Sequence, residues 1–265
     1  MNVFTHDEYI RGQIRAARRM QWIGLALVFV SMVLAFWPTE NYLTIFLAYP
    51  FLLAGLPIWT AARATQRRLG QSARVYQLIN NELKGLSNKY SLHHYPMVEG
   101  TPISHLLVGP QGLIVLLSSQ AAGPVTCRGG PRGDVWRSKS GLLDKMTGLN
   151  PPVGNPSKGL DEAISAARQL LQKLGKPNVP VRGVVVFTGN PQIFVDGCSY
   201  RAVPLHELRQ TVQELLGDME ADAKRDADAR QRLEAVLTSD DRRRINALLN
   251  PAPAVVVPKP ASVRR

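Results

Sequence analysis

Residues 104–120 read SHLLVGPQGLIVLLSSQ, and this stretch decides the fold. Two apolar runs flank a Gly-Pro-Gln-Gly turn, which predicts two antiparallel strands joined by a tight hairpin. The hairpin contains no acidic residue and no lysine. What this lack of charge means depends on where the hairpin sits and what surrounds it.

The segments around the hairpin predict a mixed α/β domain. Before it, residues 69–86 place apolar side chains close to helical spacing, and YSLHHYPMV at 90–98 adds a strand to an antiparallel meander. After it, a weaker strand pair is expected near 125–127 and 134–137.

A helix and several strands are expected further along the chain. Asn155-Pro156 has the form of a helix N-cap followed by the proline favoured at the first helical position. The apolar run at 179–189 is typical of a buried strand. Short strands at 192–197 and 201–205 and a closing helix at 204–216 complete the predicted domain, and Thr238 is expected to cap a charged helix.

Two uncharged segments near the start predict a membrane hairpin. Residues 20–37 and 42–62 carry no charged side chain, and each approaches the length that spans a bilayer core. Arginines cluster on the two outer flanks, at Arg11, Arg15, Arg18, Arg19, Arg63, Arg67, Arg68 and Arg74. Under the positive-inside rule both termini are cytoplasmic. The alternative is a cleaved signal peptide ending near Ala35.

The chain therefore divides into five expected segments. They are a cytoplasmic basic N-terminus at 1–19, a two-helix transmembrane hairpin at 20–62, a cytosolic domain at 63–217, a charged helical appendage at 218–250 and a disordered Pro-rich tail at 251–265. The appendage is expected to be solvated, because its apolar positions do not sustain heptads.

Composition narrows the partners and the compartment. The 265 residues are 45% hydrophobic and carry a net charge of +12, which favours phosphates or anionic lipids without distinguishing them. Cys127 and Cys198 are too few and too far apart for a disulfide framework, and neither has the spacing of a zinc-ligand pair. We therefore expect a reducing compartment.

The order of elements, the glycine-turn hairpin, Trp136, NPSKG at 155–159 and VVVF at 184–187 together resemble the nuclease-related (NERD) domain family. The resemblance covers roughly residues 69–216. It implies a restriction-endonuclease-like mixed sheet flanked by helices, in a bacterial inner-membrane setting. It also implies phosphodiester hydrolysis, in which an aspartate and a glutamate hold Mg²⁺ and a lysine helps to activate water.

Aligned on the family pattern, this chain lacks the catalytic side chains. Ser104 stands where the resemblance implies the aspartate, Leu117 at the glutamate and Ser119 at the lysine. Gln71 and Gly159 stand at a further glutamate and a glutamine of the family. Without carboxylates, nothing offsets the desolvation of a hard dication. The bare hairpin therefore predicts a pseudoenzyme with no metal and no cofactor.

Two alternatives stay open. One is an active Mg²⁺-dependent nuclease with relocated ligands, because acids that might reach the pocket remain in the domain, namely Glu99, Asp134, Asp161 and Glu162. The other is a purely structural membrane protein.

A cluster of basic residues indicates a possible phosphate-binding surface. Arg128, Arg132, Arg137 and Lys139 surround a glycine-rich turn and suit phosphates, although the same charges suit an anionic membrane surface. We expect a membrane-anchored, catalytically inactive binding or scaffolding module. Its expected partners are the lipid bilayer and either nucleic acid or an unidentified protein.

Overall fold

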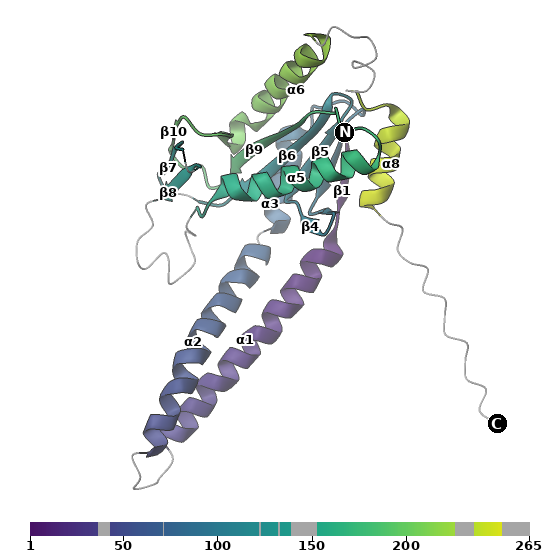
Figure 1. Cartoon of the computed structure of the whole chain (residues 1–265). Coiled ribbons are helices and arrows are strands. Elements are labelled where there is room, and N and C mark those ends of the chain that lie inside the picture. Colours follow the sequence, from purple (N-terminus) through teal and green to yellow (C-terminus); the bar gives the residue numbers. More distant parts are fainter. Residues whose placement is uncertain are drawn as a thin grey trace, which may run out of the picture.

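Two long helices extend away from an α/β domain in the computed structural model (Figure 1). The structure describes residues 1–36, 43–70, 72–121, 123–131, 133–138, 153–225 and 236–250. Helix α1 (Asp7–Phe36) and helix α2 (Leu43–Gly70) lie side by side. Within α1, Ile10–Phe36 is long and apolar enough to cross a membrane.

The two long helices approach each other closely at Gly24 and Gly55. A Cβ atom added at Gly24 would lie 2.9 Å from the carbonyl oxygen of Gly55. Small residues let two helix backbones approach this closely. Near the domain, Gln66 Nε2 donates a hydrogen bond of 2.7 Å to Gln21 Oε1 and links the helices again.

The central sheet has six strands in the order β1-β2-β5-β6-β9-β11. Their bounds are β1 (Asn2–Thr5), β2 (Ser91–His94), β5 (His105–Gly109), β6 (Gly112–Ser119), β9 (Val181–Phe187) and β11 (Arg201–Pro204). Strands β2, β5 and β6 form the predicted antiparallel meander, whereas β1–β2, β6–β9 and β9–β11 are parallel pairs. The mixed sheet flanked by helices confirms the predicted fold class.

Strand β1 was not anticipated, because only a basic N-terminus was expected there. Its sequence NVFT contains β-branched and aromatic residues that favour a strand. The amino group of Met1 donates a hydrogen bond of 2.8 Å to Asn88 Oδ1 and anchors the strand. Because β1 precedes α1 and β2 follows α2, the two outer ends of the helical pair are joined to one sheet.

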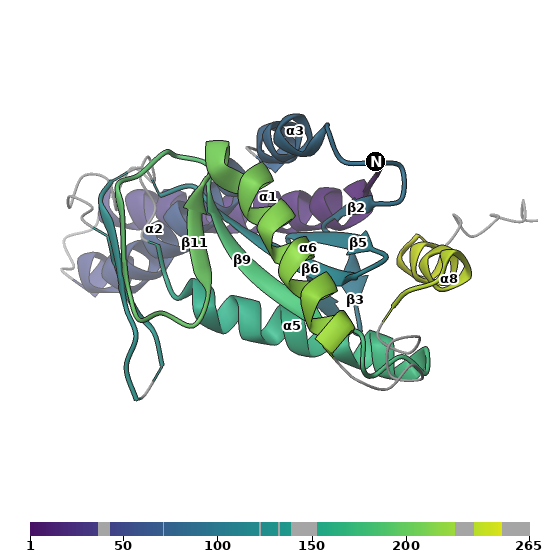
Figure 2. The same cartoon turned by 90° about the horizontal axis from the view of Figure 1, so that it is seen from above.

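Helices cover both faces of the sheet. Helix α5 (Pro156–Lys173) lies along one side and α3 (Ser72–Leu83) on the other (Figure 2). The short 3-10 helix η1 (Leu205–Glu207) and α6 (Leu208–Arg225) pack on the α3 side. Neighbours in β6 point to opposite faces, so Val115 joins the core under α5 and Leu116 the core under α3 and α6. As predicted, the Asn155 side chain caps α5 by accepting from the Lys158 N–H.

Helix α8 (Ser239–Leu249) corrects the expectation of a solvated appendage. Ile245 and Leu249 are buried in the core cluster that includes α5. Two apolar residues one turn apart are enough to dock a short helix, so sustained heptads are not required. The predicted cap is present, since Thr238 and Asp241 form a reciprocal capping box.

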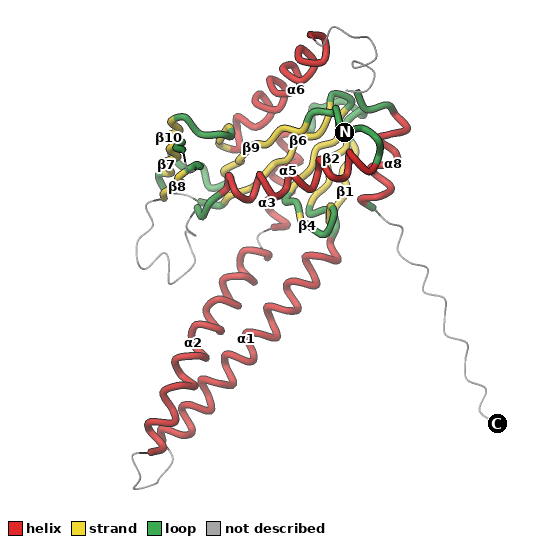
Figure 3. The backbone as a smooth tube through the Cα atoms, in the orientation of Figure 1, coloured by secondary structure: helices red, strands yellow, loops and turns green. Residues whose placement is uncertain are grey.

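Two smaller sheets complete the domain. Strands β10 (Ile193–Asp196), β7 (Val125–Arg128) and β8 (Val135–Ser138) form a sheet in the order β10-β7-β8, which lies at one end of the domain (Figure 3). The predicted pair of β7 and β8 is thereby confirmed, with β10 as an added partner. Strands β3 (Met97–Val98) and β4 (Thr101–Pro102) form a two-stranded hairpin.

Candidate functional site

The two middle strands of the sheet carry most of the positions at which the resemblance implies catalytic residues. His105 of β5 pairs with Leu116 of β6, so Ser104 and Leu117 follow as the next opposed positions. Ser119 lies two residues further along β6 and pairs with Phe187. The hairpin therefore brings Ser104, Leu117 and Ser119 to one end of the strand pair. Gln71 lies outside the described residues.

Leu117, which stands where the resemblance implies a metal-binding glutamate, packs against apolar neighbours. Its side chain is half-buried and packs against the core cluster beneath α5. A Cβ atom added at Gly159, in the first turns of α5, would lie 3.5 Å from Leu117 Cδ2. The positions of the family's glutamate and glutamine are thus adjacent here, and a hydrocarbon side chain lies between the strand and the helix.

Asp134 is the most buried of the four remaining acids and has a structural role. Its carboxylate accepts hydrogen bonds from Ser157 Oγ, from the Ser199 N–H and, at 3.1 Å, from Ser199 Oγ. Trp136 Nε1 in turn donates to Ser157 Oγ at 2.8 Å. These contacts hold together the start of β8, the start of α5 and the turn after β10.

Two further acids also have partners. Asp161 accepts a hydrogen bond from the Tyr200 hydroxyl, and burial together with this bond raises the pKa of Tyr200 to about 12. Glu99 forms an ion pair with Lys173. Asp134 and Asp161 are thus engaged at residues 199–200 near the start of α5, and Glu99 is engaged elsewhere with Lys173, whereas Glu162 is exposed.

Cys127 and Cys198 form a disulfide with a Cα–Cα distance of 6.3 Å. This bond corrects the expectation that the two cysteines are too few and too far apart in the sequence to be linked. They are 71 residues apart in sequence, but β7 and β10 are parallel neighbours in which Cys127 pairs with Val195, and Cys198 follows shortly after. No local sequence pattern indicates the pairing of β7 with β10.

Among the described residues, one group of potential metal ligands comes together. The Cys127 and Cys198 sulfur atoms and an Asp134 carboxylate oxygen lie within 4.8 Å of one another. The two sulfur atoms are bonded to each other, so this arrangement offers a metal only the carboxylate.

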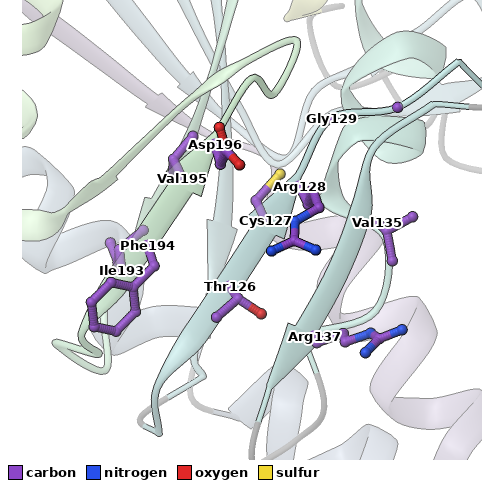
Figure 4. Close-up of a pocket in the computed structure, with 11 residues that line it drawn as sticks. Thr126, Cys127, Arg128, Gly129, Val135, Arg137, Ile193, Phe194, Val195 and Asp196 are labelled. Atoms are coloured by element: carbon purple, nitrogen blue, oxygen red, sulfur yellow. The ribbon is translucent and has the colours of Figure 1, made fainter.

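The three-stranded sheet presents an open face with a cavity of about 740 Å³ (Figure 4). Pairing across β10, β7 and β8 aligns one row of Phe194, Thr126 and Arg137 and a second row of Asp196, Arg128 and Val135. We call these six residues the outer sheet face. Arg132 and Lys139, the other two predicted phosphate-binding residues, lie outside the described part of the chain.

The outer sheet face combines charge with exposed apolar surface. Phe194 is 58% exposed and Val135 is 52% exposed, beside the exposed Arg128 and Arg137. Guanidinium groups bind phosphate oxygens, and an exposed aromatic ring offers a surface on which a base can stack. This face is therefore chemically suited to a phosphate-bearing ligand with a planar or apolar group. The sequence predicted Arg128 and Arg137 as possible phosphate-binding residues but did not point to Phe194.

Buried histidines form a second polar feature near the start of α1. Ser118 Oγ lies 3.2 Å from His105 Nε2, His105 Nδ1 lies 2.7 Å from His94 Nδ1, and His94 Nε2 lies 2.8 Å from Asn80 Oδ1. Since the Asn80 oxygen only accepts, His94 donates from Nε2, and two neutral rings that each donate once satisfy this chain. Burial and the neighbouring His93 lower the pKa of His94 to about 4, and burial lowers that of His105 well below its usual value.

The fold is a mixed α/β domain that is joined at both ends to a pair of apolar helices. The sequence model of the nuclease-related domain (NERD) matches residues 70–188, and the chain therefore contains a NERD domain. No curated protein and no solved structure matches the chain significantly.

Proposed function

We propose that this chain is a membrane-anchored, catalytically inactive NERD protein that acts as a binding or scaffolding module at the cytoplasmic face of a bacterial inner membrane. Nucleic acid is the ligand class that we propose for the outer sheet face. The main observation that supports catalytic inactivity is that Leu117 packs against the core beside Gly159. An isobutyl group neither ligates a metal nor orients water.

The surroundings of the remaining acids support inactivity. Asp134 already accepts three hydrogen bonds, Asp161 is bonded to Tyr200, and Glu99 is paired with Lys173. A two-carboxylate Mg²⁺ site would require breaking these contacts and moving the acids to the hairpin. The active nuclease with relocated ligands is therefore the disfavoured alternative.

Sheet pairing supports a two-pass topology. Strand β1 before α1 and strand β2 after α2 are hydrogen-bonded neighbours, so they lie on the same side of any membrane that α1 crosses. This pairing supports an even number of crossings, and we propose α2 as the returning helix. Apolar side chains on both helices face outward, as lipid contact requires: Phe29 is 66% exposed and Phe46 is 76% exposed.

Charge and aromatic placement support the cytoplasmic orientation. The arginine clusters flank the outer ends of the helical pair, and the Arg63 guanidinium carbon lies 5.3 Å from the centre of the Trp59 ring. Arginine and tryptophan together are typical of the interfacial region. Thiol labelling of single engineered cysteines from either side of intact cells tests the orientation, and labelling of Asn2→Cys from outside only would reverse it.

A salt titration tests the ligand class. The purified full-length chain is titrated with a labelled DNA duplex at increasing NaCl concentration. The logarithm of the binding constant falls linearly with the logarithm of the salt concentration, and each lost phosphate contact lowers the magnitude of this slope by about 0.9. We expect the double variant Arg128→Gln with Arg137→Gln to lower the magnitude of the slope by about 2. The control variant Arg243→Gln, in α8, should leave the slope unchanged. Absence of binding at low salt would remove nucleic acid as the ligand.

A cleavage assay tests inactivity. The same preparation is incubated with labelled DNA and RNA in Mg²⁺ or Mn²⁺, with Asp161→Asn as the matched variant. We expect no cleavage above the background that both proteins share. Metal-dependent cleavage by the natural chain that Asp161→Asn abolishes would establish the relocated-ligand nuclease instead.

A further inference from the structure

The disulfide lies behind the outer sheet face, because the side chain of Cys127 alternates with those of Thr126 and Arg128 and points to the core side of the sheet. Cys127 is in the middle strand of the three-stranded sheet, is 2% exposed and is followed by Arg128, which lines the cavity. Cys198 is half-buried, in the segment between β10 and β11. An attacking thiol can therefore reach Cys198 Sγ more readily than Cys127 Sγ.

Close backbone contacts and hydrogen bonds surround the Cys127–Cys198 disulfide. The Gly129 N–H donates a hydrogen bond of 2.8 Å to the Asp196 carbonyl, and a Cβ atom added at Gly129 would lie 1.8 Å from the Gly197 carbonyl oxygen. On the far side of the disulfide, Ser199 donates to Asp134. The turn at residues 197–199 is thus held against β7 and β8 by hydrogen bonds on both sides and by one covalent bond between them.

We propose that the Cys127–Cys198 bond is a reversible redox link, broken and re-formed in the cell, that controls binding at the outer sheet face. The inference rests on the proposed function in one respect, the cytoplasmic location of the domain. Disulfides in that compartment are typically transient and redox-sensing, because thiol reductants keep structural cysteines reduced.

The chemistry requires a cellular dithiol in one direction and a peroxide in the other. A thiolate of the dithiol attacks Cys198 Sγ, the S–S bond breaks, and Cys127 leaves and takes up a proton. The second thiol of the reductant then displaces Cys198 and closes the reductant's own disulfide, so two electrons and two protons reach the cysteines. In return, a peroxide oxidises Cys198 to a sulfenic acid and releases water, and Cys127 displaces a second water to restore the bond.

Reduction changes the binding face through β10. Asp196 and Arg128 are paired residues in neighbouring strands, and Gly197 follows Asp196 directly. Once the covalent bond is broken, the turn at 197–199 and β10 are held by hydrogen bonds alone, so Phe194 and Asp196 are fixed less rigidly relative to Arg128. We therefore expect the oxidised form to have the fixed, higher-affinity outer sheet face.

The first test measures the redox state in living cells. Cells that express the full chain are quenched in acid, and free thiols are tagged with a heavy maleimide before electrophoresis, with Cys127→Ser as the unpaired control. We expect reduced chain in growing cells, disulfide after a peroxide pulse and recovery of thiols afterwards. Cysteines that stay oxidised throughout, as on the oxidising side of the membrane, or stay reduced throughout would overturn the proposal.

The second test measures the consequence on the purified full chain. The affinity for a labelled DNA duplex is compared before and after treatment with a dithiol, and Cys127→Ser is compared in both conditions. We expect reduction to weaken binding at least about fivefold, the lower end of typical coupling between sites, and the variant to be insensitive to the dithiol. Equal affinities would overturn control of binding. If no DNA binds in either state, the proposed ligand fails, the proposed control of binding fails with it, and the in-cell thiol measurement still decides reversibility.

Discussion

Leu117 Cδ2 lies 3.5 Å from the position that a Cβ atom would take at Gly159. These residues stand at two positions where the family resemblance implies polar side chains, and here they form a contact between β6 and α5. The contact explains why both substitutions are compatible with one fold. A leucine at the end of the strand needs a partner surface, and a glycine on the helix leaves room for it.

Replacing Gly159 by alanine tests this contact. A separation of 3.5 Å is ordinary van der Waals contact, and Gly159 lies within α5, so alanine should stabilise the fold by up to about 1 kcal/mol through helix propensity. Gly217→Ala in α6, where nothing lies within 4 Å, is the matched control with the same expected gain. Thermal unfolding of the full chain in detergent measures both. A loss of stability in Gly159→Ala but not in Gly217→Ala would mean that the Leu117 side chain lies too close to position 159 to admit a methyl group.

Introducing the missing glutamate should destabilise the domain. Leu117→Glu removes packing and places a carboxylate against apolar neighbours, which we expect to cost about 1–3 kcal/mol. Leu117→Met keeps a hydrocarbon-like volume and should cost less than about 1.5 kcal/mol. If thermal unfolding finds the glutamate variant as stable as the methionine variant, the site is open and polar rather than filled.

Gly129 and Gly130 should respond differently to alanine although they are neighbours. At Gly129 a Cβ atom meets backbone at 1.8 Å, whereas at Gly130 the nearest atom is 3.6 Å away. Backbone cannot rotate aside as a side chain can, so Gly129→Ala should cost about 1–3 kcal/mol and Gly130→Ala well under 1. Equal melting temperatures for the two variants would contradict the described packing of the turn after β10.

The buried histidines predict a loss of stability in mild acid. Burial, opposed by a hydrogen bond to Asn246, lowers the pKa of His93 to about 4, and His94 has the same value. The unfolded chain titrates near 6.5 and so binds more protons between about pH 6.5 and 4. The contribution of the neutral rings is present above pH 6.5 and is lost as the pH falls through this window.

The size of this effect can be measured with one substitution. Each histidine adds up to about 1.4 kcal/mol per pH unit to the slope within the window. His93→Gln keeps a partner for Asn246 but does not ionise, so it should reduce the slope by up to one such increment. His206→Gln, at an exposed position, is the control. An unchanged slope in His93→Gln would show that His93 is not held neutral.

The disulfide should contribute strongly to stability under oxidising conditions. In the chain-entropy model, closing a loop with a sequence separation of 71 restricts the unfolded state by roughly 4 kcal/mol. Cys127→Ser should lose most of this difference, and adding a reductant should lower the melting temperature of the natural chain but not that of the variant. Melting temperatures that do not respond to reductant would mean that the bond is absent in solution.

Local sequence rules predicted the elements whose signals are contiguous. The meander follows from apolar runs around the Gly109–Gly112 turn, and α5 follows from Asn155-Pro156 and its apolar stripe. The cap at Thr238 follows from the spacing of its own four residues. In each case the information lies within one turn or one strand pair.

The features that were missed depend on partners far apart in sequence. Residues Asn2–Thr5 form strand β1 by pairing with the edge strand β2. Helix α8 is docked because Ile245 and Leu249 pack into the core cluster beneath α5. The disulfide requires the parallel pairing of β7 with β10. At the candidate site, the resemblance predicted which positions lack polar side chains, but only the structure shows that Leu117 packs against α5 near Gly159.

Titration of the full chain with Mn²⁺, followed by electron paramagnetic resonance, tests the central claim most directly. A divalent cation requires oxygen ligands between β5 and β6, where Ser104 and Leu117 now lie. We predict that the Mn²⁺ signal of the natural chain shows no saturable site and equals that of Leu117→Met. A saturable site with one bound ion, lost on Asp161→Asn or Asp134→Asn, would contradict the account.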